Sequence, residues 1–469
     1  MKKEFKVSQA DILLQKDIAD QLSGLICGTK KYYIQTYGCQ MNSHDSEKIA
    51  GIFEQCGFVK ASDKTSADLI VFNTCCVREH AELRVFGNVG ALRTQKEENH
   101  ELIIGVCGCM MQQEDVAKKL YKRYPFVDLI FGTHEMYKLP EMFSNVINGQ
   151  RVINLAKNDD DIAEGIPVIR NGSFSTNVNI MYGCNNFCSY CIVPYVRGRE
   201  RSRSHKDIID EIRQLSALGY TEITLLGQNV NSYRSPDAGE SIDFPGLLKL
   251  INEIDGIERI RFLTSHPKDL SHRLIEAMAT LDKVCKHIHL PVQSGSTRIL
   301  DEMNRKYTRE GYLALVDELK KNVPGIEITT DIIVGFPGET DEDFNDTLTL
   351  VEAVGYSAAY TFKYSKRKGT KAAVMQNQVS EEVKKQRLRR LNDCVVMTLK
   401  MLNEKYIGTR GVVLVEGCDD TRSGKMAFGK LSNFKTVYFP GDESLIGQYL
   451  VVSIDEVMNN SLKGTLVSK

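Results

Sequence analysis

Short apolar runs alternate with amphipathic segments along much of the chain. Between Lys31 and about Gly149, runs of four to six apolar residues are separated by stretches with helical periodicity. Strands buried on both faces have this continuous apolar character, because helices cover both sides of a parallel sheet. The pattern predicts a doubly wound α/β domain over residues 31–150, with one long helix from about Arg78 to Lys96. Its predicted strands are KYYIQTYG, DLIVFNTC, ELIIGVCGC and VDLIFG.

The segments on either side of this domain lack the alternation. Residues 1–30 are polar and weakly patterned, so we expect a poorly ordered or helical extension. Residues 151–175 are rich in Asn, Asp and Gly and are interpreted as a linker.

A second alternating series begins near Val178 and extends through the middle of the chain. It contains six strand–helix repeats, which are too few for a closed eight-unit barrel. We therefore predict an open, partial βα barrel with a connecting helix over residues 176–405. Its predicted strands are VNIMYG, EITLLG, RIRFLT, HIHLPV, IEITTDIIVG and AAYTFKY.

The pattern changes again towards the carboxyl end. Residues 380–406 predict one amphipathic helix with Ser380 as N-cap and an apolar stripe of Leu388, Leu391, Val395, Leu399 and Leu402. After Gly408, short β runs are broken by Gly, Asn and Asp. Residues 406–469 are therefore predicted to form a small all-β barrel of the OB-like kind.

Charge and composition narrow the class of protein. Among the 469 residues, 60 Lys and Arg balance 61 Asp and Glu, so any nucleic-acid contact must come from a local patch. The chain has no apolar run long enough for a transmembrane helix, and its start does not have the features of a secretory signal. We expect a cytoplasmic enzyme that does not associate with membranes.

Cysteine usage is the most informative part of the composition. Thirteen cysteines are present, and Cys184, Cys188 and Cys191 lie within eight residues. Two tight pairs, Cys75/Cys76 and Cys107/Cys109, lie further upstream. An odd number of cysteines in a large chain without a signal peptide argues against a disulfide framework. Reduced thiols grouped in this way indicate metal or redox chemistry.

The first such group has the spacing C-x3-C-x2-C, in GCNNFCSYC, directly after the first strand of the partial barrel. Active sites of such folds lie in loops at the carboxyl ends of the strands. Three thiolates can hold three irons of a [4Fe-4S] cluster and leave the fourth open to a ligand. A structural zinc site with His205 as a fourth ligand is the alternative, but the spacing favours iron–sulfur. Tyr190 is either core filler or an aromatic face for a purine ring.

A second group is predicted in the amino-terminal domain. Cys39 ends the first strand, Cys75 ends the second and Cys109 follows the third. Because the carboxyl ends of parallel strands share one edge of a sheet, these three thiolates can converge and hold a second cluster. Cys76 should point away from Cys75, whereas Cys107 shares a face with Cys109 if the strand continues. The choice between Cys107 and Cys109 therefore stays open on this basis.

Several motifs together resemble a known family. C-x3-C-x2-C with an aromatic residue before the third cysteine, on a partial barrel, resembles the radical S-adenosylmethionine (SAM) superfamily. LLGQNVNSY, TSHP, HLPVQSGS, MNRKYT and TTDIIVGFPGET, together with TYGCQMN at residues 36–42, resemble the methylthiotransferase family. TYGCQMN is similar to its MiaB-type tRNA-modifying branch, and the resemblance spans residues 31–469.

The resemblance implies a ligand set and a SAM site. Cys39, Cys75 and Cys109 would hold one [4Fe-4S] cluster, and Cys184, Cys188 and Cys191 the other. The loop after the second barrel strand would meet the amino-acid end of SAM. Polar residues at the other strand ends suit its ribose and carboxylate, although strand-end capping explains them equally well. The candidate SAM contacts are Tyr190, Gly227, Gln228, Asn229, Ser265, Gln293, Thr330 and Asp331, with Gly335, Pro337 and Gly338 allowing the backbone to approach the adenine.

Two basic segments are candidate RNA contacts. Arg197, Arg199, Arg201 and Arg203 follow the cysteine loop, and a second block between residues 363 and 390 has ten Lys or Arg and two acidic residues. In that block, Lys366 and Lys368 stand where the family usually has Pro. Such runs are often only solvated surface, but phosphate contacts by them would be salt-sensitive. The carboxy-terminal barrel resembles the family's RNA-binding TRAM domain.

The resemblance implies a specific reaction. One cluster would cleave SAM to a 5′-deoxyadenosyl radical that abstracts hydrogen from C2 of an adenine, and the other would supply sulfur. The expected substrate is N(6)-dimethylallyladenosine at position 37, in the anticodon loop of tRNA, and a donor such as flavodoxin or ferredoxin would supply electrons to a monomer. Methylthiolation of a threonylcarbamoyl-adenosine tRNA or of a ribosomal-protein aspartate is the alternative, and a zinc-bearing RNA-binding protein is a remote third.

Overall fold

The structure is a computed structural model of the 469-residue chain. It describes residues 7–76, 79–155, 162–170, 172–237, 241–421, 424–458 and 460–468. The chain forms two compact units. The amino-terminal unit comprises Met1–Gly172, Met181–Asn185 and Ile192–Arg203, and the carboxy-terminal unit comprises Ser173–Ile180, Asn186–Cys191 and Ser204–Lys469.

The amino-terminal unit is built on a parallel sheet of six strands in the order β2-β1-β3-β4-β5-β6. All six residues of β3 are buried, as expected for a strand covered on both faces. The strands are β1 (Lys31–Thr36), β2 (Val59–Lys60), β3 (Leu69–Thr74), β4 (Ile103–Gly108), β5 (Leu129–Phe131) and β6 (Val152–Asn154).

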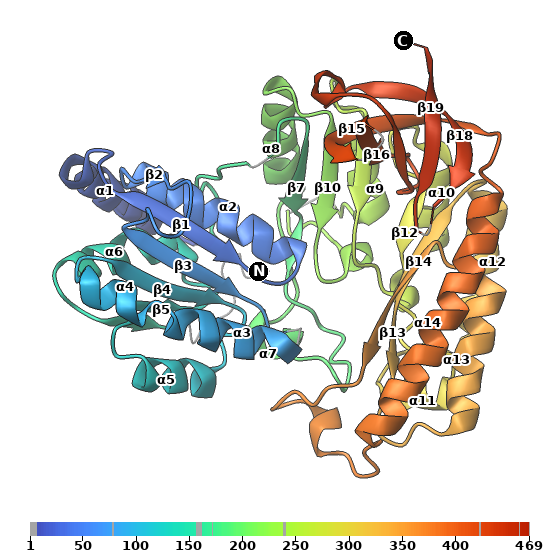
Figure 1. The fold of residues 1–469 in the computed structure, drawn as a ribbon, viewed down its shortest axis with the longest axis horizontal. Coiled ribbons are helices and arrows are strands. Elements are labelled where there is room, and N and C mark those ends of the chain that lie inside the picture. The colour runs from blue at the N-terminus through green and yellow to red at the C-terminus, as the bar shows by residue number, and fades with distance from the viewer. Residues whose placement is uncertain are drawn as a thin grey trace. The chain divides into compact units, whose positions relative to one another are not determined.

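Helices cover both faces of this sheet. One apolar core lies under α1 (Gln9–Ile26), α2 (Gln40–Gln55) and α6 (Leu139–Ile147). The other lies under α3 (Glu79–Gly90), the turn before α4 (Arg93–Glu98), and α5 (Glu114–Arg123). In Figure 1, α2 runs along one face of the blue strands and α5 lies beyond the other. The predicted doubly wound α/β domain is confirmed.

Four details of this unit differ from the sequence prediction, and one of them is β2, which lies outside the predicted strands. Helix α1 lies within the predicted extension and packs Ala19, Leu22 and Ile26 into the first core, so it is an integral part of the unit. The single helix predicted from Arg78 is instead divided into α3 and α4, because the chain turns at Ala91 and Leu92. The predicted linker contributes β6 to the sheet edge.

The carboxy-terminal unit contains the predicted six parallel strands. They form two three-stranded sheets, β11-β10-β7 and β12-β13-β14, and an isolated bridge joins Ile260 of β11 to Val284 just before β12. The strands are β7 (Ser175–Asn179), β10 (Glu222–Leu226), β11 (Arg259–Phe262), β12 (His287–His289), β13 (Glu327–Val334) and β14 (Ala358–Lys363). The first strand ends earlier than predicted, because Met181–Tyr182 (β8) pairs instead with Arg201–Ser202 (β9).

Helices follow the strands of this partial barrel. They are α8 (His205–Ala217), α9 (Phe244–Asn252), α10 (His272–Thr280), α11 (Thr297–Glu302), α12 (Arg309–Asn322) and α13 (Asp341–Val354). The long helix α14 (Glu381–Glu404) begins at the predicted N-cap, where Ser380 Oγ accepts a hydrogen bond from the Val383 N–H. Its predicted apolar stripe is buried or half-buried.

The last five strands close into a small barrel in the order β15-β16-β17-β19-β18. They are β15 (Arg410–Thr421), β16 (Gly424–Lys430), β17 (Thr436–Pro440), β18 (Tyr449–Val457) and β19 (Leu462–Ser468). The barrel contacts the first residues of the partial-barrel strands. Arg259 and Arg261 of β11 donate hydrogen bonds to four of its backbone carbonyls, and His287 of β12 stacks on Phe434.

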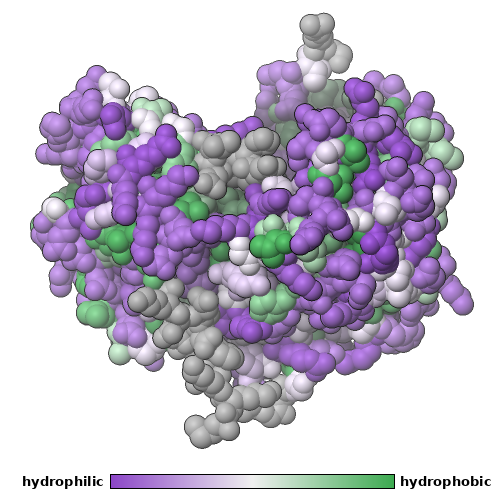
Figure 2. Space-filling model, turned by 90° about the horizontal axis from the view of Figure 1, so that it is seen from below, coloured by the Kyte–Doolittle hydropathy of each residue, from purple (hydrophilic) through white to green (hydrophobic). Residues whose placement is uncertain are grey.

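The surface is mainly polar. On the face drawn in Figure 2, hydrophilic residues predominate and apolar residues form small separate patches, which is usual for folded proteins. Within the described part of the chain, none of the helices combines the length and apolarity needed to span a membrane.

Candidate metal centres and substrate site

The three predicted ligands of the amino-terminal unit lie at the carboxyl edge of its sheet. Cys39 is the N-cap of α2, Cys75 directly follows β3, and Cys109 directly follows β4. The chain enters α2 through Gly38, whose φ is +110°. A Cβ at Gly38 would lie 2.4 Å from the Cβ of Cys75 and 2.7 Å from its Sγ. Only glycine therefore permits the turn that brings this segment so close to Cys75.

The structure separates Cys107 from Cys109. Cys107 is the next-to-last residue of β4. Its side chain lies in the core under α1, α2 and α6, where burial raises the pKa of the thiol. Gly108, with φ +96°, then turns the chain, so that Cys109 lies with Cys76 in a different buried cluster. The two cysteines do not share a face, because the strand ends between them.

Cys76 is a close neighbour of Cys109. A hydrogen bond between the two thiols lowers the pKa of Cys109 to about 7, and the nearby Arg197 guanidinium acts in the same direction. The same hydrogen bond and burial raise the pKa of Cys76. Cys109 therefore has the lower pKa of the two thiols, and the thiolate is the form of cysteine that binds metals.

Arg197 occupies an unexpected position. Its Nε–H donates to the Sγ of Cys109 at 2.9 Å, and its Nη2 donates to Asn42 Oδ1 and Asp45 Oδ2, both at 2.8 Å. Only 4% of Arg197 is exposed, so its charge is compensated inside the unit rather than by solvent. It belongs to the arginine run after the second cysteine group, for which the sequence suggests an RNA contact instead.

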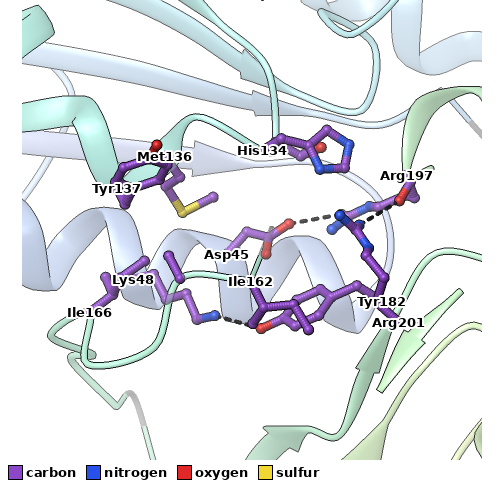
Figure 3. A pocket seen from close by; sticks show the side chains of 12 residues that line it. Asp45, Lys48, His134, Met136, Tyr137, Ile162, Ile166, Tyr182, Arg197 and Arg201 are labelled. Atoms are coloured by element: carbon purple, nitrogen blue, oxygen red, sulfur yellow. Dashed lines mark hydrogen bonds and ion pairs between the residues drawn. The ribbon is translucent and has the colours of Figure 1, made fainter. Parts of the chain in front are cut away.

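A pocket of about 510 Å³, a volume that includes open solvent, adjoins Arg197 (Figure 3). Asp45 points towards the Arg197 guanidinium, Lys48 donates to the Tyr182 hydroxyl at 2.9 Å, and Arg201 donates to the Arg197 carbonyl at 3.0 Å. Burial, together with Arg201 and Arg197, lowers the pKa of His134 to about 3. The imidazole in this pocket is therefore neutral at physiological pH.

The C-x3-C-x2-C loop is held by backbone contacts. In the amino-terminal unit, the Cys184 N–H donates to the Gly198 carbonyl at 3.2 Å. In the carboxy-terminal unit, the Cys191 N–H donates to the Cys188 carbonyl at 2.9 Å, and Asn304 Nδ2 donates to the carbonyls of Asn186 and Phe187. Cys184 and Cys188 are buried and Cys191 is half-buried.

Arg305, in the MNRKYT motif, contacts Cys188 much as Arg197 contacts Cys109. Its Nη1–H donates to the Cys188 Sγ at 3.4 Å, its Nε to the Tyr307 hydroxyl at 2.8 Å and its Nη2 to the Pro291 carbonyl at 2.8 Å. Burial leaves 6% of Arg305 exposed. Sequence reasoning missed this role, although the motif itself is conspicuous, because nothing in the spacing connects Arg305 to Cys188.

In the described residues, neither cysteine group has the geometry of a site for a single metal ion. Among the described residues, no three His, Cys, Asp or Glu side chains are placed to hold one metal ion. A [4Fe-4S] cluster is bound through separate irons, so its ligands stand further apart than those of one ion. His205, the fourth ligand considered for zinc, has its Nδ1 2.7 Å from Asp237 Oδ2 and is buried at the start of α8.

The predicted SAM residues divide between two environments. Gly227, Gln228 and Asn229 follow β10, and Ser265 follows β11. Asn229 Nδ2 donates to Asp269 at 2.7 Å, while its Oδ1 and the Ser265 Oγ are buried without a hydrogen-bond partner in the described structure. Buried polar atoms of this kind usually have a partner. They are therefore suited to a polar ligand at the carboxyl ends of these strands.

Two more of the predicted residues lie together on β13 and its neighbour. Gln293, with φ +71°, donates its N–H to the Asp331 carbonyl at 2.9 Å, and the Asp331 carboxylate lies 3.4 Å from His289 Nε2. Thr330 instead faces the other side of β13, where its Oγ1 accepts from the Val292 N–H and donates to the Leu290 carbonyl. The Thr330 hydroxyl therefore links β13 to the backbone of residues 290 and 292.

Tyr190 and the GFPGE turn lie on the same side of the unit. Tyr190 packs against the cluster of Ile299, Met303, Phe336, Tyr364 and Ala372, and burial raises its pKa. Gly335 has φ +72°, and a Cβ there would lie 2.3 Å from Lys384 Cγ. Gly335 is thus required by packing against α14, whereas a Cβ at Gly338 (φ +78°) would have no atom within 4 Å.

Burial narrows the set of RNA-contact candidates. Arg197, Arg201 and Arg203 are all buried, and Arg203 forms an ion pair with Glu164 at 2.6 Å. A solvent-facing phosphate site formed by the whole run does not fit this arrangement, because three of its four guanidinium groups are enclosed. Arg199, Lys366 and Lys368 are exposed.

Comparisons with known proteins agree with this architecture. Family models match for the radical SAM superfamily over residues 178–351, for an uncharacterized protein family, UPF0004, over residues 31–132, and for the TRAM domain over residues 404–467. Among solved structures, the radical S-adenosylmethionine methyltransferase TsrM of Kitasatospora setae, with cobalamin and a [4Fe-4S] cluster bound, is similar in fold. Its TM-score is 0.53 at 14% identity, over 74% of this chain and 77% of that one.

Two curated relatives match nearly the whole chain. The tRNA-2-methylthio-N(6)-dimethylallyladenosine synthase of Alkaliphilus oremlandii is 53% identical over 465 residues, covering 99% of this chain and 98% of the relative. The enzyme of the same name from Clostridium tetani is 54% identical over 434 residues, covering 92% and 95%. The family resemblance inferred from the motifs is thereby confirmed. The chain belongs to the radical SAM family of tRNA-2-methylthio-N(6)-dimethylallyladenosine synthases.

Proposed function

We propose that this protein adds a methylthio group to C2 of N(6)-dimethylallyladenosine at position 37 of tRNA. The observation that carries the proposal is the near-full-length identity to synthases of that name, on a chain with two separate cysteine groups. The proposal includes a small electron-transfer protein, such as flavodoxin or ferredoxin, as reductant and a monomeric, cytoplasmic enzyme.

In the amino-terminal unit, Cys39, Cys75 and Cys109 are proposed to hold one [4Fe-4S] cluster. Three features support this assignment: the shared sheet edge, the glycine that admits Cys75, and the Arg197 N–H on the Cys109 sulfur. An N–H donor and a positive charge at a sulfur stabilise thiolate and cluster charge. Cys76 is close enough to hydrogen-bond Cys109 and remains a neighbour of the proposed ligand set.

Cys184, Cys188 and Cys191 are proposed to hold the second cluster and, with it, SAM. The buried Arg305 supports this, since its N–H is directed at the Cys188 sulfur. When bound, the two clusters would supply an electron for reductive cleavage of SAM and sulfur for transfer. The buried polar atoms of Asn229 and Ser265, which follow β10 and β11, would orient SAM, and the apolar cluster around Tyr190 would exclude water.

The substrate part of the proposal rests on the relatives' names and the TRAM match. A base in the anticodon loop is unpaired, so it can be unstacked and drawn into a site. Its dimethylallyl group is apolar, and burying about five carbons could favour the prenylated base by up to roughly 4 kcal/mol. We therefore expect the enzyme to need prior prenylation of its tRNA.

The proposal is tested with anaerobically reconstituted enzyme, SAM, a reductant and two matched tRNAs, prenylated and unmodified. Nucleoside analysis by mass spectrometry should find the methylthio product only in the prenylated tRNA. Equal turnover of both, or turnover only of a threonylcarbamoyl-adenosine tRNA, would reject the substrate assignment.

Replacing Cys39, Cys75 and Cys109 by Ala should halve the iron and abolish methylthiolation, but leave 5′-deoxyadenosine formation measurable. The matched Cys184, Cys188 and Cys191 triple variant should lose both activities.

A further inference from the structure

Two aromatic side chains stand exposed on strand β14, which forms one edge of its sheet. Tyr360 is 51% exposed and Phe362 is 46% exposed, although neither lies in a loop. The register pairs Tyr360 with Asp331 and Phe362 with Ile333 of β13. Because paired residues of parallel strands share a face, these four side chains form one strip on the sheet.

The strip lies on the side of the sheet opposite α14. The alternate residues of β14 point to that helix, where Thr361 Oγ1 contacts Asn392 Oδ1 at 2.6 Å and Lys363 donates to Glu381 at 2.8 Å. Helices α13 and α14 run along one side of β13 and β14 in Figure 1. Tyr360 and Phe362 therefore project towards the inner face of the partial barrel, which these helices do not cover.

Polar groups lie beside the Tyr360 ring. His289 packs edge-on against the Tyr360 ring, with centroids 6.0 Å apart and an angle of 68°. The same imidazole lies 3.4 Å from the Asp331 carboxylate and 3.0 Å from Thr329 Oγ1. The strip thus combines exposed aromatic faces with hydrogen-bonding groups that can meet the edge of a planar ring.

The chain that leaves β14 is strongly basic. Lys366, Arg367, Lys368 and Lys371 follow within eight residues of Lys363, and no acidic residue occurs between positions 363 and 380. Lys366 and Lys368 are exposed. Aromatic side chains that continue into a positively charged segment are the usual means of binding single-stranded nucleic acid, since bases stack on the rings and phosphates meet the cations.

We propose that Tyr360 and Phe362 form a stacking surface for unpaired bases of the tRNA anticodon loop that flank the target adenosine. The inference rests on the proposed function, because it takes tRNA to be the substrate. Asp331 and His289 would contact the edge of a stacked base, and the basic segment after β14 would hold the adjoining phosphates. The rings add affinity without reading sequence, because every base has a flat face.

The test uses the full-length reconstituted enzyme and four variants: Tyr360→Ala, Phe362→Ala, and the ring-preserving Tyr360→Phe and Phe362→Tyr. The matched control is Met397→Ala, because Met397 is 69% exposed on α14. The probe is a prenylated anticodon stem–loop RNA with 2-aminopurine beside position 37, whose fluorescence falls when the base stacks. We expect each alanine variant to weaken RNA binding by roughly 5- to 100-fold and to restore the fluorescence, as loss of one stacked base should do. Ring-preserving variants and the control should bind as the unsubstituted enzyme does.

The outcomes separate this inference from the proposed function. Unchanged binding and quenching in both alanine variants, with an unsubstituted enzyme that binds RNA, would overturn the stacking surface alone. Loss of SAM binding in the alanine variants, with RNA binding intact, would also overturn it and place the rings at SAM. Failure of the unsubstituted enzyme to bind the RNA would instead overturn the tRNA assignment on which it rests. Iron content and circular dichroism confirm that each variant is folded.

Discussion

At the scale of single residues, the two arginines on cysteine sulfurs govern the electrostatics of the proposed centres. Arg197 and Arg305 are both buried, and each directs an N–H at one sulfur, of Cys109 and Cys188. Hydrogen bonds to the sulfurs are among the features that set the reduction potential of iron–sulfur clusters. An N–H donor and a cation favour the reduced, more negative state, so each arginine should raise the potential of its own cluster.

We predict that Arg197→Lys, which keeps the charge but loses the N–H fork, lowers the midpoint potential of the amino-terminal cluster. A change of about 1.4 kcal/mol in the interaction corresponds to roughly 59 mV for one electron. The measurement is an EPR-monitored redox titration of each cluster. Arg305→Lys is the matched variant, and it should shift only the other cluster. Arg199→Lys, at an exposed position of the same run, is the control. If the two arginine variants shifted both clusters alike, local control by these N–H groups would be excluded.

At the scale of elements, β11 and β12 contact the small barrel through side-chain hydrogen bonds to its backbone and through a ring stack. Arg261 donates to Glu222 at 2.8 Å and to the Leu431 and Ser432 carbonyls, and Phe434 stacks on His287 with centroids 4.6 Å apart. Phe434 has φ +75° in the turn between β16 and β17, and the interface holds it there.

Truncation after Tyr406 is therefore predicted to destabilise the partial barrel as well as to remove the region that matches the TRAM domain. The guanidinium groups of Arg259 and Arg261 would lose four backbone acceptors, and a hydrogen bond that involves a charged group contributes about 1.5 to 3 kcal/mol to stability. Thermal unfolding of the truncated protein should show a lower midpoint than that of the full chain. An unchanged midpoint would mean that water replaces the carbonyls at little cost.

Acid is predicted to loosen the same interface. Burial lowers the pKa of His287 to about 3, and the neighbouring Arg261, His289 and Lys430 act in the same direction. The unfolded state, with an ordinary pKa of about 6.5, binds a proton that the folded state does not, so the contribution is complete above pH 6.5 and is lost as pH falls towards 3. The cost at pH 5.5 is about 1.4 kcal/mol.

Hydrogen–deuterium exchange of the turn that carries Phe434 measures this effect. Exchange, corrected for its intrinsic pH dependence, should be faster at pH 5.5 than at pH 7.5. His287→Phe, which keeps a ring against Phe434 but cannot be protonated, should remove most of the difference. His272→Phe is the control, because His272 is exposed on α10. If His287→Phe kept the full difference, another group would be responsible.

The elements that were predicted correctly are those that local pattern determines. The N-cap and stripe of α14, four of the six strands of the amino-terminal sheet and the six strands of the partial barrel follow from periodicity and capping chemistry, which need no tertiary information. The cysteine groups were located because strand ends of a parallel sheet share an edge. The roles of Arg197 and Arg305 were not predictable in this way. Their sulfur partners lie 88 and 117 positions away in the chain, and charge in a sequence is normally a sign of exposure.

At the scale of the whole molecule, binding of a polyanion has to be local, because the net charge is only -1. The basic segment after β14 supplies such a region, with Lys366 and Lys368 exposed. We predict that Lys366→Glu with Lys368→Glu reduces the slope of log affinity against log salt by roughly 0.7 to 0.9 for each phosphate that the protein no longer binds. Filter binding of tRNA across a salt series measures it. Lys400→Glu, at an exposed position of α14, is the matched control. If the double variant and the control had the same slope, Lys366 and Lys368 would not contact phosphates of the tRNA.

The way in which the small barrel is attached has a consequence for how this architecture can vary. Arg259 and Arg261 donate to main-chain carbonyls of residues 412 and 430–432, and a carbonyl is the same whatever side chain its residue carries. Substitutions on the barrel surface can therefore accumulate without weakening its attachment, provided that the turn around Phe434 keeps its conformation. The barrel should behave as an interchangeable part: a chimera carrying the corresponding barrel of the Clostridium tetani relative should assemble on this partial barrel, with its RNA affinity set by the donor.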